Sequence, residues 1–270
     1  NMLSKWLHSR GLFTLGSRFK SVLHSEFADT DALRTYVSQQ IHDFHALNGR
    51  GVIAHFNPKS YERYIWFARI GDGSLGGKAR GLAFLNSLVQ KYNLSRKYDD
   101  VKISIPRTIV VATDYFDQFI VENGLQYVID SEISDEEILS EFVSSRLPEG
   151  LVEQLKSYID TVRAPLAVRS SSKLEDSSYQ PFAGVYSTYM IPLVENKSQM
   201  LRMLGKAIKS VYASVFYAGS RTYIQTTANL LSEEKMAVVI QSICGSQHDG
   251  LYYPMLSGVA RSVNFYPIGN

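Results

Sequence analysis

A cluster of glycines between a predicted strand and a predicted helix is the feature that most constrains how this chain folds. The aromatic and β-branched run YIWFARI, residues 64–70, predicts a strand. It leads directly into GDGSLGGKARGLAFL, residues 71–85, which contains five glycines. Apolar residues then recur with helical spacing at positions 82, 85, 88, 89 and 92. Because glycine loses more conformational entropy on folding than any other residue, the cluster indicates a backbone that turns sharply or approaches something closely.

Lys78 lies at the start of this predicted helix, where the helix dipole favours an anion rather than a cation. Either a bound anion lies between the exposed N–H groups and the ammonium, or the segment is a strand-to-helix turn with a surface lysine. It is not a Walker A loop, because Asp72 stands in place of the first glycine and Ala79 in place of the hydroxyl residue. It also does not fit the dinucleotide-binding fingerprint, whose third glycine and downstream acid are poorly placed here.

The rest of the chain alternates between helical and strand patterns, which predicts an α/β or α+β fold. Thr113 is expected to cap a helix that ends at Asn123-Gly124, and Ser134 to Glu137 has the spacing of a capping box. The other predicted helices cover residues 29–48, 149–162 and 198–217. The remaining predicted strands are TIVVAT, LAVRSSS, FAGVYSTYM, MAVVIQSIC and SGVARSVNF. A loop of about a dozen residues is expected between the last two.

Composition excludes several classes of protein. A net charge of +2 does not suggest an electrostatic nucleic-acid binder. The single cysteine, Cys244, fits a reducing compartment, and no apolar run approaches the roughly 20 residues that a membrane span needs. We therefore expect a cytoplasmic protein. Residues 1–60 are expected to form a helical segment or linker, with an apolar stripe that Gly11 and Gly16 interrupt. The stripe comprises Trp6, Leu12, Phe13, Leu15, Phe19 and Leu23.

A second polar stretch is LAVRSSSKLEDSSYQPFAGVYSTYM, residues 166–190. An apolar strand is predicted to deliver Arg169 to its end, followed by a polar loop of serines. A guanidinium offers a rigid fork to phosphate oxygens, and hydroxyl groups can complete an anion site. The alternative is a surface loop with an arginine–carboxylate pair.

Taken in order, these motifs resemble the N-terminal ATP-binding domain shared by phosphoenolpyruvate synthase and pyruvate phosphate dikinase. The Gly-Gly-Lys-Gly-type segment of that family reads here as residues 76–79, with IPRTIVVAT in place of its next strand. The pattern VRSSxxxEDxxxxxFAGxxxTY reads as residues 168–189. YASVFYAGSRTYIQ, MAVVIQSIC and SGVARSV correspond to the later motifs. The resemblance runs from about residue 69 to the C-terminus and depends on several motifs in one order.

This resemblance implies an α+β, ATP-grasp-like nucleotide-binding domain that is cut off at its C-terminal side. It implies that Lys78 reaches the phosphates of ATP, that Arg169 is catalytic and neutralises charge on the transferring phosphoryl group, and that Gln241 lines the adenine pocket. The full set of implied nucleotide-binding residues is Gly76, Gly77, Lys78, Arg169, Ser170, Gly184, Thr188 and Gln241. Residues 61–147 would form a first α/β subdomain with the Gly-Gly-Lys loop, and residues 148–270 part of an ATP-grasp subdomain.

The chain also departs from the family pattern. Ala79 replaces a glycine, and Arg261-Ser262 stands where Phe-Thr is common. The resemblance implies magnesium, whose ligands we expect beyond the end of this chain, so no metal ligand is assigned here. None of the six histidines stands after the glycine-rich turn expected of a phosphorylated histidine. The phosphohistidine and acceptor-binding parts are therefore expected on other domains of a longer protein.

The function implied for the longer protein is that of a dikinase, which passes phosphate from ATP through a histidine to pyruvate or a similar acceptor. This chain alone is expected to show no turnover, and neither nucleic acid nor membrane is expected as a partner. The alternative is a module of a signalling protein that senses nucleotide or acts as a scaffold without catalysis.

Overall fold

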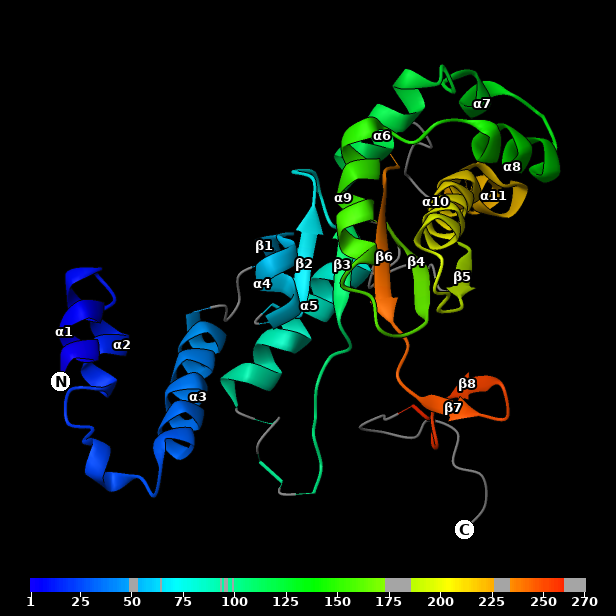
Figure 1. Cartoon of the computed structure of the whole chain (residues 1–270). Helices are drawn as coiled ribbons and strands as arrows, with labels where there is room; N and C mark the ends of the chain where they lie inside the picture. The colour runs from blue at the N-terminus through cyan, green and yellow to red at the C-terminus, as the bar shows by residue number, and fades with distance from the viewer. Residues whose placement is uncertain are drawn as a thin grey trace, which may run out of the picture.

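The structure, a computed structural model of the 270-residue chain, describes residues 1–48, 53–63, 65–92, 94, 97–98, 100–172, 186–225 and 234–259 (Figure 1). It is a mixed α/β fold. The α-helices are α1 Met2–Ser9, α2 Phe13–Arg18, α3 Thr30–Asn48, α4 Pro58–Arg63, α5 Gly76–Lys91, α6 Thr113–Glu122, α7 Tyr127–Asp130, α8 Asp135–Ser144, α9 Glu149–Ile159, α10 Lys197–Ala213 and α11 Ala218–Gln225. The strands are β1 Ala54–His55, β2 Phe67–Ile70, β3 Thr108–Val111, β4 Leu166–Ser172, β5 Thr188–Ile191, β6 Met236–Ser242, β7 Ser246–His248 and β8 Leu251–Tyr253. Short 3₁₀ turns are η1 His24–Glu26 and η4 Ser214–Phe216.

Six strands form one mixed sheet in the order β1-β2-β3-β6-β4-β5. Strands β1, β2 and β3 pair in parallel, whereas β6 pairs antiparallel with both β3 and β4, and β5 pairs antiparallel with β4. Strand β6 therefore lies in the middle of the sheet, although it comes last of the six in the sequence. Its apolar run Met236–Ile240 is fully buried, as expected for a strand that is covered on both faces.

The two faces of the sheet carry two separate hydrophobic cores. One face packs against α6, α8, α9 and α10, and its core includes Val168, Val238 and Ile240. The opposite face packs against α5, and its smaller core includes Ala79, Val110 and Val239. Alternation along each strand decides which side chains reach which core. The first turns of the helix that follows the glycine cluster thus pack on this face of the sheet.

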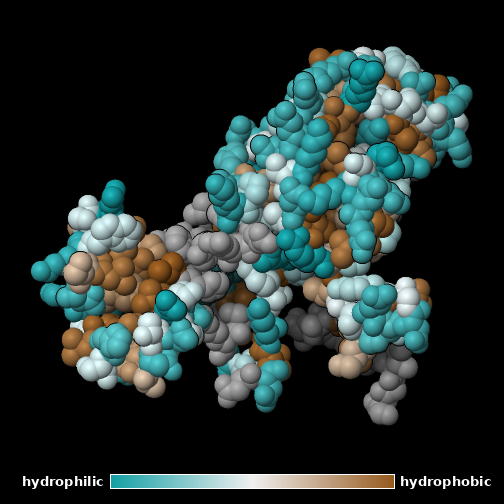
Figure 2. All heavy atoms as spheres, viewed as in Figure 1, coloured by the Kyte–Doolittle hydropathy of each residue, from teal (hydrophilic) through white to brown (hydrophobic). Residues whose placement is uncertain are grey.

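The N-terminal helices form a third core of their own, from Leu7, Leu15, Phe19 and Phe44. Figure 1 shows α1–α3 standing to one side of the sheet, beyond its β1 edge. The predicted apolar stripe is only partly correct, because Trp6, Phe13 and Leu23 are exposed while Leu15 and Phe19 are buried. The break follows from the chain reversal at Gly11, where φ is +77° and α1 folds back on α2. Figure 2 shows brown, hydrophobic atoms gathered on the surface of this helical unit.

Several sequence-based boundaries are confirmed, and others are wrong for reasons of tertiary packing. Helix α8 has the predicted capping box, in which the Ser134 hydroxyl accepts from Glu137 N and the Glu137 carboxylate accepts from Ser134 N. Thr113 is not the N-cap of α6, since the cap is Ala112 and the Thr113 hydroxyl accepts from Ser74 N instead. The predicted loop after β6 contains the hairpin β7–β8. Residues 257–259 of the last predicted strand are not in a strand, and the rest of it lies outside the described residues.

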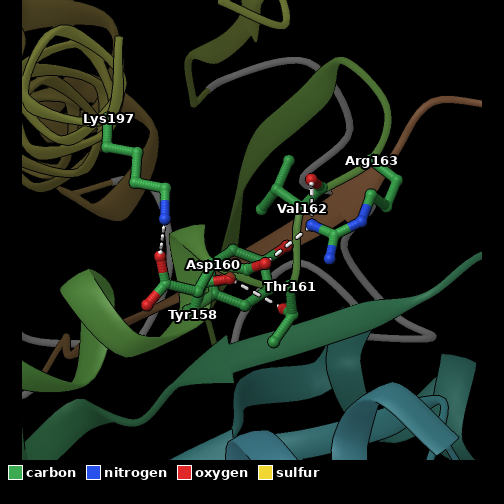
Figure 3. A network of polar contacts seen from close by, with 6 residues as sticks. All are labelled: Tyr158, Asp160, Thr161, Val162, Arg163 and Lys197. Atoms are coloured by element: carbon green, nitrogen blue, oxygen red, sulfur yellow. Dashed lines mark hydrogen bonds and ion pairs between the residues drawn. The ribbon is translucent and has the colours of Figure 1, made fainter. Parts of the chain in front are cut away.

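The segment between α9 and β4 is held by a small network of polar contacts (Figure 3). The Thr161 hydroxyl donates to the Tyr158 carbonyl at 2.7 Å, which closes the last turn of α9. Arg163 donates to the carbonyls of Asp160 and Val162, and Lys197 at the start of α10 forms an ion pair with the Asp160 carboxylate. These contacts fix the point from which β4 enters the sheet.

None of the helices among the described residues is both long enough and apolar enough to span a lipid bilayer.

Candidate functional site

The glycine loop, residues 71–75 between β2 and α5, lies in close contact with other parts of the protein. At Gly71, where φ is +92°, an added Cβ would meet the Asp114 carboxylate at 2.5 Å. At Gly73 it would meet Asp114 N at 2.5 Å. At Gly76, the first residue of α5, φ is +71° and an added Cβ would overlap the backbone carbonyl of Ser171. The glycines are therefore required by a close approach of protein to protein, from α6 on one side and β4 on the other.

Hydrogen bonds join the glycine loop to the start of α6. Asp72 N donates to Asp114 Oδ2 at 2.8 Å, and Ser74 N donates to Thr113 Oγ1 at 2.9 Å. Thr113 N donates in return to the Ser74 carbonyl at 3.0 Å. Two of the backbone donors that this loop could offer to a ligand, Asp72 N and Ser74 N, are thus already used within the protein.

Arg69 on β2 holds the same loop from the sheet. Its Nε donates to the Gly71 carbonyl at 2.7 Å and its NH2 to the Gly73 carbonyl at 3.1 Å. A guanidinium has a rigid planar fork, so two bonds to carbonyls two residues apart fix the path of the backbone between them. Sequence reasoning missed this residue. The signal that points to it is an arginine two residues before the first glycine of the cluster.

Lys78 in the first turn of α5 points toward β4. Its Nζ donates to Ser170 Oγ at 3.3 Å, across 92 residues of sequence. Ser170 is 1% exposed and adjoins Arg169 in the chain. The lysine of the glycine cluster and the arginine of the serine motif thus lie in neighbouring parts of the fold.

Strand register places Arg169, Thr188 and Gln241 on one face of the sheet, whereas Ser170 alternates to the other face with Val238. Arg169 is paired with Thr188 on β5 and with Val239 on β6, and paired residues share a face. Arg169 is half-buried, and its three following serines continue the strand rather than starting a loop, because they pair with residues 236–238. Gln241 lies on the same face, opposite Ala167. It is 9% exposed, and its amide donates to Thr108 Oγ1 at 2.9 Å.

Ser171 links β4 to both the glycine loop and α5. Its buried hydroxyl donates to the Leu75 carbonyl at 2.8 Å and accepts from Ala79 N at 3.0 Å. The hydroxyl therefore satisfies one of the donors that a helix leaves unpaired in its first turn. Sequence reasoning named the neighbouring Ser170 and missed Ser171, although both belong to the same run of serines.

The structure thus places Gly76 and Lys78 against β4, which carries Arg169 and Ser170, and pairs Arg169 with Thr188 on the next strand, β5. Gly77 is buried in the first turn of α5. Gly184, and the carboxylates Glu175 and Asp176 of the same motif, lie outside the described residues. Arg261 also lies outside them.

The electrostatics of the site have a positive and a negative side. Lys78 and Arg80 lie in α5, whose first turn holds no acidic residue. Arg69 and Arg169 lie on the sheet face against which α5 packs. The carboxylate of Asp114 lies on the α6 side of the loop. Burial raises the pKa of the nearby Tyr115 hydroxyl, and the charges of Asp114 and Asp72 raise it further. An anion approaching from the α5 and β4 side would meet mainly cations.

Comparison with known families agrees with this geometry. The sequence model of the family described as pyruvate phosphate dikinase, AMP/ATP-binding domain, matches residues 72–268, which is more than half of the chain. The chain belongs to this family. The match includes both the Lys78 segment and the Arg169 strand, so the two segments that the fold brings into contact are parts of one AMP/ATP-binding domain.

Two curated relatives were found by sequence similarity. The "uncharacterized phosphotransferase YvkC" of Bacillus subtilis is 28% identical over 151 residues, which is 56% of this chain and 17% of that protein. The phosphoenolpyruvate synthase of Aeropyrum pernix is 24% identical over 214 residues, which is 70% of this chain and 24% of that protein. The chain thus spans less than a quarter of the length of either relative.

Across the part of the chain that the structure describes, no three His, Cys, Asp or Glu side chains are grouped so that they would hold a metal ion.

Proposed function

We propose that this chain binds ATP at the junction of α5 with β4, as the nucleotide-binding part of a phosphotransferase. The observation that carries the proposal is the contact between Lys78 Nζ and Ser170 Oγ at 3.3 Å, which sets the lysine beside the strand of Arg169. Two cations near one another attract a polyphosphate more strongly than either alone, and an arginine fork suits phosphate oxygens. Membership of the AMP/ATP-binding family supports the same ligand.

In this proposal each residue has a separate role. Lys78 and Arg169 stabilise the negative charge of the phosphates, and Ser170 holds the lysine in place when no nucleotide is bound. Thr188, directly opposite Arg169, offers a hydroxyl at the exposed edge strand β5. Gly76, Gly77 and Gly184 allow the backbone to approach the nucleotide closely. Gln241 lines the adenine pocket. Phosphoryl transfer needs mainly positioning and electrostatic stabilisation from the protein, which these groups supply.

For the longer protein we propose an ATP-grasp-like dikinase that passes phosphate through a histidine to pyruvate or a similar acceptor. The support is the family match and the similarity to a relative named phosphoenolpyruvate synthase. We propose that the histidine, the acceptor site and the magnesium ligands belong to other parts of that longer protein. No step of phosphoryl transfer is derived from a metal held by the described residues. We also propose that the chain divides into an N-terminal helical segment or linker, residues 1–60, a first α/β subdomain, residues 61–147, and part of an ATP-grasp subdomain, residues 148–270.

Titration calorimetry of the 270-residue chain with a non-hydrolysable ATP analogue tests the proposal. Charge-assisted hydrogen bonds contribute about 1.5–3 kcal/mol each, so Lys78→Ala and Arg169→Ala should each weaken binding by about ten- to a hundredfold. The melting temperature should change little, because neither side chain belongs to a hydrophobic core.

Matched controls come from residues that the proposal does not place in the nucleotide site. Lys197→Ala removes another lysine from the first turn of a helix, and Arg163→Ala removes another arginine near β4. Both should bind the analogue like the unmodified chain. Equal binding by Lys78→Ala and the unmodified chain would show that Lys78 is not a phosphate ligand.

A further inference from the structure

The structure points to a role for Arg69 and Ser171 that the family match does not assign. Both donate hydrogen bonds to backbone carbonyls of the glycine loop, and neither is among the residues proposed to contact ATP. They approach the loop from different strands, β2 and β4, which are separated in the sheet by β3 and β6. Their common target is the segment that leads to Lys78.

Arg69 and Arg169 stand in one row across the sheet. Arg69 pairs with Val110, Val110 with Val239, and Val239 with Arg169. Neighbouring strands are about 4.8 Å apart, so three steps separate the two arginine Cα atoms by about 14 Å. Although the two arginines share a row, the Arg69 guanidinium donates its hydrogen bonds to the carbonyls of Gly71 and Gly73. Arg69 therefore acts on the loop, while Arg169 is left to act on a ligand.

Ser171 cannot contact a ligand directly, because its side chain is 0% exposed. Its hydroxyl instead joins the last residue of the glycine loop to the first turn of α5, through the Leu75 carbonyl and Ala79 N. Lys78 lies between these two bonded positions. Any movement of the Lys78 backbone away from β4 is therefore opposed by two hydrogen bonds of a buried hydroxyl.

We propose that Arg69 and Ser171 are positioning residues, which hold the glycine loop and the first turn of α5 in one conformation so that Lys78 faces the Arg169 strand before nucleotide binds. The effect on ATP affinity rests on the proposed function, whereas the effect on the loop does not. A site that is already ordered loses less conformational entropy on binding, so preorganisation raises affinity without any new contact to the ligand.

Hydrogen exchange measured by mass spectrometry tests the positioning role in the absence of nucleotide. Arg69→Met and Ser171→Ala should speed the exchange of backbone amides in residues 74–79 by about tenfold or more, because they remove bonds that oppose local opening. Arg163→Met is the matched control for the arginine, since Arg163 also donates to two backbone carbonyls. Ser210→Ala is the control for the serine, since Ser210 is 2% exposed and bonded within α10. Both controls should leave exchange in residues 74–79 unchanged.

Affinity for the ATP analogue separates positioning from charge. Loss of the bonds should weaken binding about tenfold in Arg69→Met and Ser171→Ala. Arg69→Lys keeps the charge and loses the planar fork, so it should bind as weakly as Arg69→Met. Ser171→Ala removes no charge, so its binding should keep the salt dependence of the unmodified chain.

The outcomes separate this proposal from the proposed function. If exchange in residues 74–79 is the same in both variants as in the unmodified chain, the positioning role is wrong, whatever the affinity for ATP. Full recovery of affinity in Arg69→Lys would also overturn it, because Arg69 would then act through its charge. If the unmodified chain fails to bind the analogue, the proposed function fails, and the exchange experiment still decides the positioning role. Should Arg69→Met fail to fold, Ser171→Ala carries the same test.

Discussion

Replacing Gly76 by alanine tests whether the start of α5 is pressed against β4 as the structure shows. The backbone of Gly76 has φ of +71°, and an added Cβ would overlap the Ser171 carbonyl. A left-handed conformation costs a residue with a side chain about 1–2 kcal/mol, and overpacking a buried site costs about 1–3 kcal/mol more. Gly76→Ala should therefore lower the free energy of unfolding by about 2–5 kcal/mol.

Thermal unfolding followed by circular dichroism measures this loss, which corresponds to a fall in melting temperature of about 5–15 °C for a chain of this size. Gly124→Ala separates the backbone strain from the steric overlap. Gly124 also has positive φ, at +62°, but an added Cβ there has nothing within 4 Å. It should lose only the strain term of about 1–2 kcal/mol. Gly219→Ala in helix α11, with open space and ordinary φ, should lose nothing. If Gly76→Ala is no less stable than Gly124→Ala, the close contact between α5 and β4 is wrong.

Two further predictions concern stability away from the site. Ser134→Ala removes the N-cap of α8 and should lower the free energy of unfolding by about 1 kcal/mol in urea titrations, whereas Ser144→Ala at the other end of the helix should change it by less than about half of that. Equal losses in the two variants would contradict the capping role. Burial raises the pKa of Tyr212, and burial with a lesser contribution from Tyr189 raises the pKa of Tyr217 from 10.0 to about 12. Between these pH values the two tyrosines keep their protons in the folded state and lose them in the unfolded state. The free energy of unfolding should therefore be highest below pH 10.0 and fall as the pH rises toward about 12. A free energy of unfolding that is constant across this range would contradict the prediction.

Elements that depend on local rules could be predicted from the sequence with good boundaries. Helix α3 ends at Asn48 as predicted, α8 begins with the predicted capping box, and Gly124 has the positive φ expected after the end of α6. In each case the residues that decide the boundary lie within one turn of it. The order of motifs around Lys78 and Arg169 was also sufficient to identify the family.

Elements that depend on tertiary partners were predicted less well. Thr113 has the chemistry of an N-cap, but its hydroxyl is taken by Ser74 N from the glycine loop, and no local rule contains that donor. Leu85 and Tyr92 have the spacing of a buried stripe, yet they are 49% and 60% exposed, because α5 packs on the sheet mainly through its first turns. The hairpin β7–β8 was missed because its strands have three residues each and every one of them is exposed.

The sequence by itself determined that a glycine cluster lies between a strand and a helix that carries Lys78, and that Arg169 and a run of serines belong to an apolar segment nearly a hundred residues later. It left open whether the glycines serve a bound anion or a turn. The tertiary structure showed that Gly71 and Gly73 lie against Asp114, that Gly76 lies against the Ser171 backbone, and that Lys78 reaches Ser170 next to Arg169 in the chain. The physical reason is that close approach is a property of two segments together. A glycine shows that space is needed, but only the partner that fills the space shows why.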